Sequence, residues 1–260
     1  MIDIGVNLLH SQFDPDRDAV MARARAAGME HMVLTGTDLP ASARAAELAA
    51  TDPAFLSATA GIHPHASGSA PADWQQTIEQ LAQAPAVRAI GETGLDFNRN
   101  FSDPADQERV FRAHLALAAR LGLPVFVHER EAGAAVAGCL TEAPELADVV
   151  VHCFTGSRDD LTRFLDLGCY IGITGWVCDR RRGGPLRELV PHVPLDRLMV
   201  ETDAPFLRPH NAPADAHGRR NEPALLPWVI DQLAELYGMP SAELAATTAA
   251  NARAFFRLDG

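Results

Sequence analysis

The chain has 260 residues, 47% of them hydrophobic, and its 34 acidic and 22 basic side chains give a formal net charge of −12. The length fits one barrel of eight strand-helix units or two small domains, and the hydrophobic share is enough for a large core. The negative charge excludes a protein that attracts nucleic acid over its whole surface. A polynucleotide ligand would need a local cationic feature, of which a metal ion is the obvious example.

The opening of the chain does not resemble a signal peptide, and no segment resembles a membrane span. The opening MIDIGVNLLHSQFD lacks a basic region followed by an apolar stretch, and no apolar run is long enough to cross a bilayer. We therefore expect a soluble, cytoplasmic protein with no membrane partner. We also expect a monomer. The cysteines form no CxxC pair and are expected to be free and buried; they are Cys139, Cys153, Cys169 and Cys178.

Two groups of arginines offer local positive charge. One is the run from Arg180 to Arg182, and the other is the pair Arg219 and Arg220. They either contact phosphate or form a solvated surface, and the sequence favours neither.

Strand-like apolar runs recur along the whole chain. Most are continuously apolar, as in parallel strands that are buried on both faces. In order they are Ile2–Asn7, His31–Thr35, Phe55–Ile62, Val87–Gly91, Val125–His128, Val149–Cys153, Tyr170–Thr174 and Leu198–Glu201.

The segments between these runs carry helix signals. Asp14-Pro15 predicts a helix start and Gly28 its end, Asp103-Pro104 predicts a helix that stops at Gly122, and Ser157 with Asp160 resembles a capping box. Two more helices are expected at Pro223–Tyr237 and Ser241–Phe256. Eight strands alternating with helices predict an α/β fold, a TIM (β/α)8 barrel forming a single domain over residues 1–260. A doubly wound open sheet is the alternative.

Polar residues stand at the carboxyl end of most predicted strands, and in a barrel these ends converge on one mouth. They are Asn7, His63, His65, Glu92, Asp96, His128, His152, Glu201 and Asp203. Any one of them has an ordinary explanation, such as a structural hydrogen bond or a helix cap. Two imidazoles and two carboxylates on separate strands together suit a divalent cation.

Eight segments occur in an order that resembles the signature of a known family. They are MIDIGVNL, GIHPH, AIGETGLDFNRNF, PVFVHER, VHCFTG, YIGITGWVCDRRRG, VETDAPFL and RRNEP. The chain resembles the TatD family of metal-dependent deoxyribonucleases over essentially its whole length.

The resemblance implies a TIM barrel that hydrolyses phosphodiester bonds, as a 3′-to-5′ exonuclease on single-stranded DNA and possibly RNA, in DNA repair or nucleic-acid turnover. It implies metal ligands at Glu92, His128 and His152, and we expect Mg²⁺, with Mn²⁺ or Zn²⁺ as alternatives. Asp203 matches a metal ligand or general base, and we assign it the base. His63 and His65 match residues that face the substrate phosphate.

Two positions depart from the family pattern. Many relatives begin with Asp-x-His-x-His, where this chain has Gly5 and Asn7, so one of two metal sites is weakened or lost. Asn7 is then expected to hydrogen-bond a water or the substrate. Glu129, beside His128, either adds charge to the site or forms a loop carboxylate paired with Arg130.

Aromatic side chains near the mouth are candidates for stacking an unpaired base, although core packing is the commoner role. They are Phe97, Phe101, Trp176 and Phe206.

The first alternative function is a TIM-barrel metallohydrolase for a small amide, lactone or phosphoester, since a fold does not fix a function. The second is a non-catalytic module that binds metal or nucleic acid.

Overall fold

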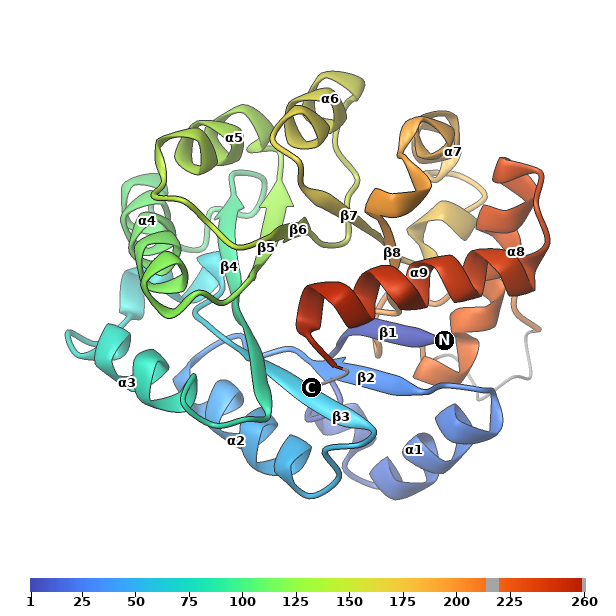
Figure 1. Cartoon of the computed structure of the whole chain (residues 1–260), viewed down its shortest axis with the longest axis horizontal. Coiled ribbons are helices and arrows are strands. Elements are labelled where there is room, and N and C mark those ends of the chain that lie inside the picture. The colour runs from blue at the N-terminus through green and yellow to red at the C-terminus, as the bar shows by residue number, and fades with distance from the viewer. Residues whose placement is uncertain (214–219, 259–260) are drawn as a thin grey trace. The chain divides into compact units, whose positions relative to one another are not determined.

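The computed structural model describes residues 1–213 and 220–258, so Arg219 lies outside the described residues. Eight strands form one sheet in sequence order from β1 to β8 (Figure 1). Their bounds are β1 Ile2–Val6, β2 His31–Leu34, β3 Leu56–Ala60, β4 Val87–Asp96, β5 Val125–Arg130, β6 Val149–Val151, β7 Tyr170–Ile173 and β8 Leu198–Val200.

The strands form the predicted (β/α)8 barrel. Strands β3 to β6 pair in parallel, as do β7 and β8. The first strand contacts the last, and Val6 at the end of β1 forms an isolated parallel bridge with Ala204, which follows β8. A parallel sheet of eight strands whose two ends meet is a closed barrel rather than a doubly wound open sheet.

Helices follow the strands along the chain. Their bounds are α1 Arg17–Ala26, α2 Leu39–Ala50, α3 Trp74–Leu81, α4 Pro104–Leu121, α5 Gly133–Glu142, α6 Arg158–Asp166, α7 Gly184–Leu189, α8 Leu226–Tyr237 and α9 Ser241–Phe256. A short 3-10 helix, η2, spans Pro64–Ser69, and another, η6, spans Pro223–Leu225. Among the described residues no helix is long and apolar enough to cross a membrane.

Most of the predicted helix ends are confirmed. Helix α4 begins after Asp103 and ends at Gly122 in the left-handed conformation, and Ser157 and Asp160 form the capping box of α6. The predicted start at Pro15 is wrong. Residues 11–16 form successive tight turns, in which Asp14 N donates to Ser11 O and Asp16 N to Phe13 O, so α1 begins only after Asp16.

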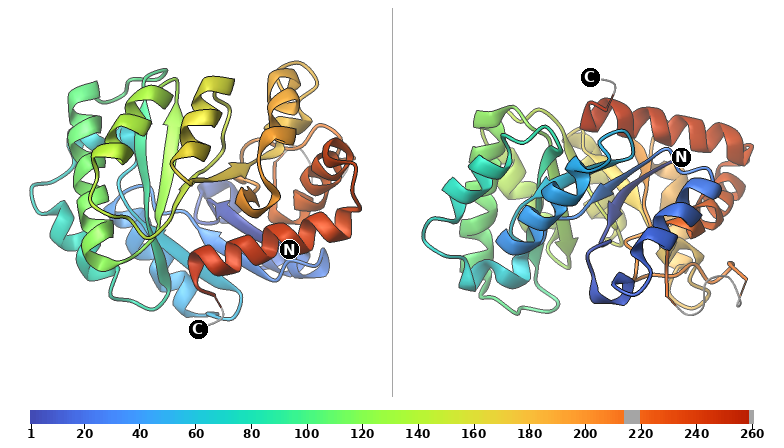
Figure 2. Two further views of the ribbon diagram at one scale, coloured as in Figure 1. Left: turned by 45° about the horizontal axis from the view of Figure 1, so that its top comes forward. Right: turned by 90° about the horizontal axis from the view of Figure 1, so that it is seen from below.

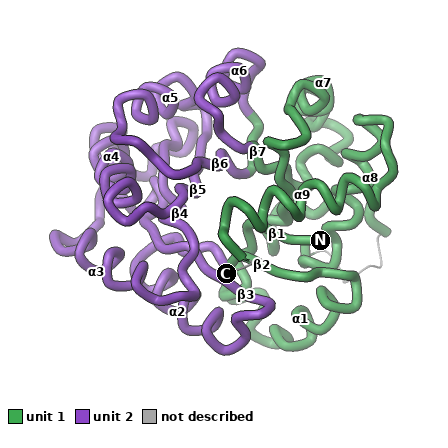
Figure 3. The backbone as a smooth tube through the Cα atoms, viewed as in Figure 1, with its two compact units in different colours: residues 1–33, 153–155, 171–260 green, residues 34–152, 156–170 purple. Residues whose placement is uncertain are grey.

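The chain divides into two compact units (Figure 3). Unit 1 contains residues 1–33, 153–155 and 171–260, and unit 2 contains residues 34–152 and 156–170. The prediction of a single domain stays a prediction.

Each unit has its own packing. In unit 2, α2 packs against β3, and α4 and α5 pack against β4 (Figure 2), around fully buried side chains such as Phe111 and Phe126. In unit 1, α8 and α9 pack together and α9 contacts β1 and β8, with Phe255 and Phe256 buried. All four cysteines are free, as predicted, but Cys153 is only half-buried.

Candidate functional site

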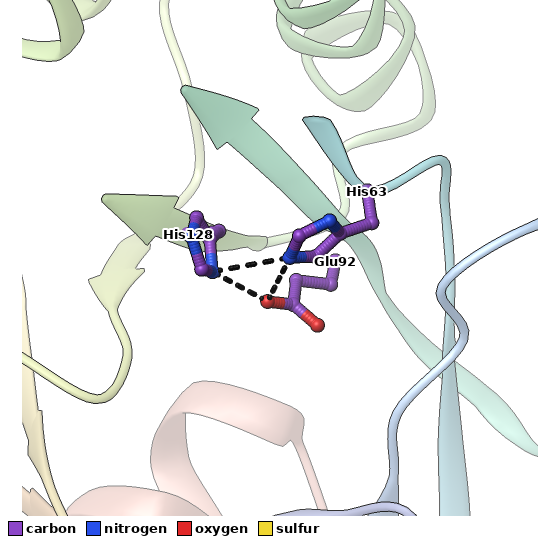
Figure 4. A group of neighbouring side chains, drawn as sticks. All are labelled: His63, Glu92 and His128. Atoms are coloured by element: carbon purple, nitrogen blue, oxygen red, sulfur yellow. Dashed lines mark hydrogen bonds and ion pairs between the residues drawn. The ribbon is translucent and has the colours of Figure 1, made fainter. Parts of the chain in front are cut away.

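Three side chains from neighbouring strands of unit 2 point toward one another (Figure 4). His63 follows β3, Glu92 lies in β4 and His128 in β5. Glu92 Oε1 is 2.8 Å from His128 Nδ1 and 3.3 Å from His63 Nε2, and the two nitrogens are 3.3 Å apart. His152 Nε2, directly after β6, lies 2.8 Å from the same carboxylate oxygen. Three imidazoles thus surround one buried carboxylate.

Glycines next to Glu92 make this arrangement possible. Gly91 has a φ of +142° and Gly94 a φ of +144°, and side chains at these positions would overlap the carbonyl oxygens of Phe126 and His128. Only glycine allows β4 to lie this close to β5, where Gly94 pairs with His128. The GETG segment therefore brings Glu92 and His128 together.

The electrostatic surroundings keep Glu92 ionised. Burial alone would raise the pKa of this carboxyl, but His63, His152 and His128 hold the pKa well below its ordinary value. Burial opposes the charged form of His128, but the neighbouring carboxylates of Asp96 and Glu92 leave its pKa raised. Burial lowers the pKa of His63, so a contact of this imidazole with phosphate would come from a neutral ring N–H and not from a cation.

The donor set has the chemistry of a divalent-cation site. Nitrogen and oxygen donor atoms of His63, Glu92 and His128 all lie within 4.8 Å of one another, with no thiolate among them. Glu92, His128 and His152 were the ligands expected from the family resemblance, and the structure gathers all three. It adds His63, which had been expected to face the phosphate.

Asp96 also belongs to this cluster, although no role was predicted for it. Its Oδ2 is 2.6 Å from His65 Nε2 and 3.5 Å from His128 Nε2. The strand continues to Asp96, so Glu92 and Asp96 lie within β4, not after it as expected. The even spacing of Glu92, Gly94 and Asp96, which places all three on one face of a strand, was the signal available in the sequence.

Two further predicted site residues contact each other in unit 1. Asn7 Nδ2 donates to Asp203 Oδ1 at 2.9 Å, and Asp203 N donates to Gly5 O at 2.9 Å. Asp203 has a φ of +52°, a conformation that costs a non-glycine residue free energy and is concentrated at functional sites. The roles proposed for Asn7 and Asp203 stay predictions.

Several other candidate charges have structural partners. Arg182 pairs with Asp179, and Arg220 pairs with Asp16 and Glu222, so these two guanidinium groups are already neutralised. Glu129 is buried and its Oε1 accepts a hydrogen bond from Ala132 N at 2.8 Å.

The candidate aromatic residues differ in exposure. Phe97 and Trp176 are half-buried, and the Arg182 guanidinium lies over the Trp176 ring. Phe101 is 65% exposed and Phe206 46%. All four remain candidates for stacking, and the latter two present the more exposed rings.

Comparison with known proteins gives a consistent result over the whole chain. The family model "TatD related DNase" matches residues 2–257. The 3′-5′ ssDNA/RNA exonuclease TatD of Erwinia tasmaniensis is 51% identical over 99% of this chain and 100% of its own, and that of Klebsiella pneumoniae is 51% identical over 100% and 98%. The crystal structure of a TatD homologue from Escherichia coli K12 has a TM-score of 0.88 at 29% identity, covering 99% of this chain and 98% of its own.

Proposed function

Because the chain belongs to the TatD-related DNase family, we propose that it is a metal-dependent nuclease that removes nucleotides from the 3′ end of single-stranded DNA and RNA. The observation that carries this proposal is the group of three imidazoles around the buried, ionised Glu92. A purely structural carboxylate has no need of three imidazole partners, whereas a metal site uses them as ligands.

Glu92, His128 and His152 would hold the ion, with His63 beside them. We propose Mg²⁺ as the native ion, with Mn²⁺ and Zn²⁺ as the alternatives. A divalent cation held there would lower the pKa of a water molecule and offset negative charge on the phosphoryl oxygens.

The remaining site residues bind the substrate and move the proton. His65 donates from Nε2 to the ionised Asp96, which fixes the orientation of the imidazole, and we assign His65 and His63 to the substrate phosphate. Asp203 takes the proton of the attacking water through its carboxylate, and Asn7 holds that carboxylate by one oxygen.

The test uses a single-stranded oligonucleotide labelled at its 5′ end, with each metal in turn and with EDTA. We expect a ladder that shortens from the 3′ end and releases mononucleotides, no product in EDTA, and an unchanged circular dichroism spectrum, because the ligands lie outside the packed core. Full activity in EDTA contradicts the metal role. Turnover of a small amide, lactone or phosphoester without cleavage of the oligonucleotide supports the alternative hydrolase, and metal binding without any turnover supports a binding module.

We further propose a cytoplasmic monomer that acts in DNA repair or nucleic-acid turnover. Light scattering of the purified protein tests the monomer.

A further inference from the structure

The loop between β4 and α4 exposes an aromatic side chain beside the candidate metal site. Phe101 is 65% exposed, more than the other large exposed hydrophobic residues of the described chain, Phe206 at 46% and Leu167 at 40%. Exposure of a phenylalanine forgoes the roughly 2 kcal/mol that burial of such a side chain contributes to stability. A ligand that covers the ring would explain its position.

The Phe101 loop, residues 97–103, is fixed on both sides of the phenylalanine. On one side, Asp96 Oδ1 accepts hydrogen bonds from Asn98 N at 3.1 Å and Arg99 N at 2.8 Å. On the other side, Ser102 Oγ donates to His65 O at 3.0 Å and accepts from Gly68 N at 2.9 Å. The ring is therefore presented in a fixed place, which lowers the entropy cost of binding a ligand there.

A series of ring contacts leads from Phe101 to the metal site. The Phe101 and His65 rings lie edge to face with centroids 4.7 Å apart. His65 contacts His63 at 4.2 Å, and His63 contacts His128 at 4.4 Å. Phe101 is thus two ring contacts away from His63, close enough for one substrate chain to reach both.

The same loop carries a positive charge. Arg99 is exposed, and its guanidinium group forms no ion pair with any residue in the described part of the chain. In a protein with a net charge of −12, an unneutralised cation beside the site provides local attraction for a phosphate. An aromatic face combined with a cation is the combination with which proteins bind single-stranded nucleic acid.

We propose that the Phe101 loop is a binding platform for the single-stranded substrate, on which an unpaired nucleobase stacks against Phe101 while Arg99 pairs with a backbone phosphate. The proposal rests on the proposed nuclease function. Stacking needs a base whose face is free, so the platform favours single strands over duplexes and discriminates little between bases. It assigns substrate selection to the β4–α4 loop.

Phe101→Ala is expected to raise KM for a single-stranded oligonucleotide about 5- to 100-fold, the effect of removing one base–aromatic stack, with a smaller change in kcat. Phe101→Tyr and Phe101→Trp should retain a KM near that of the wild type. An oligonucleotide with abasic sites near its 3′ end should bind wild type and Phe101→Ala equally, because no base remains to stack. A structural defect in the loop would weaken both substrates alike, and that result, or an unchanged KM, overturns the proposal.

Leu167→Ala is the matched control for loss of an exposed apolar side chain in unit 2, and it should leave KM unchanged. Binding can also be followed without turnover, because the fluorescence of Phe101→Trp should be quenched by an oligonucleotide and not by its abasic counterpart. Quenching without hydrolysis refutes the nuclease function and retains the platform. Hydrolysis without quenching refutes the platform and retains the nuclease.

Arg99→Gln tests the phosphate contact. Loss of one phosphate contact should reduce the slope of log KM against log salt by about 0.7 for a single strand. Arg109→Gln, which removes an exposed arginine of α4 that pairs with Asp106, should leave the slope unchanged. An equal change in the two variants overturns the role of Arg99.

Discussion

Two buried carboxylates in each unit differ in the kind of partner that faces them. In unit 2, Glu92 and Asp96 face imidazoles. In unit 1, Asp3 accepts hydrogen bonds from Thr202 and from Gly5 N, and Glu201 Oε1 accepts from Cys153 N at 2.5 Å. A backbone N–H can only donate, whereas an imidazole nitrogen can give up its proton and bind a metal. A buried carboxylate near a strand end is therefore a candidate metal ligand only when its hydrogen-bond partners can themselves bind the metal.

The burial of Asp3 illustrates the structural case. Its pKa is raised to about 7 because burial penalises the charged form, and the hydrogen bonds from Thr202 and Gly5 only partly offset this. Glu92 is also buried, yet its pKa is well below the ordinary value because imidazoles surround it. This difference supports the proposal that Glu92 holds the ion, and it lends no such support to Asp3 or Glu201.

The largest expected effect comes from Glu92→Gln. The amide keeps the shape but removes the charge that three imidazoles share, so we expect metal affinity and activity to be lost together.

Asp203→Asn should instead reduce kcat about 100- to 10,000-fold, as removal of a general base does, with little loss of metal affinity. Metal titration calorimetry beside steady-state kinetics measures the split.

Glu201→Gln provides the control in unit 1, because its amide oxygen can still accept from Cys153 N. It should leave metal affinity intact. If Asp203→Asn loses the metal as readily as Glu92→Gln, then Asp203 is a ligand and the base is another group.

The next prediction concerns how many ions are bound. Gly5 has no side chain, and the Asn7 amide is engaged with Asp203, so β1 offers a poor second site. We expect one tightly bound metal per chain without substrate, held by the Glu92 cluster. Elemental analysis of the purified protein checks this, and two tightly held equivalents would falsify it.

His63→Ala tests whether His63 is one of the metal ligands. Because Glu92, His128 and His152 already supply three ligands, we expect a much larger loss of activity than of metal affinity. A loss of affinity equal to that of His128→Ala would make His63 the fourth ligand, which its 3.3 Å separation from both Glu92 Oε1 and His128 Nδ1 allows.

Much of this fold could be predicted from the sequence because buried parallel strands are uninterrupted apolar runs. All eight were found in order, and the errors lie where polar residues or glycines occur inside a strand. The predicted strand ends at Gly91, whereas β4 continues to Asp96, and Gly94 is needed for its close approach to β5. The contact between Asp96 and His65 depends on the path of η2, which no local pattern reports.

The smallest expected effect belongs to Asp16 of unit 1, whose carboxylate pairs with Arg23 and Arg220. Hydrogen bonds from Arg220 and Arg23 lower the pKa of Asp16 from 3.8 to about 2. A carboxyl with a depressed folded-state pKa stabilises the fold above its ordinary pKa, and the contribution is lost as pH falls toward 2. Because the Asp16 side chain is 35% exposed, solvent screening limits its contribution to stability to about 1 kcal/mol or less.

Asp16→Asn should lower Tm slightly at roughly pH 5 to 7, which lies above the ordinary pKa range of an aspartate. The difference in Tm from wild type should shrink as the pH is lowered, and metal affinity should not change. Thermal melts across this range measure it, and a difference that does not vary with pH would show that packing, and not the charge of Asp16, is responsible.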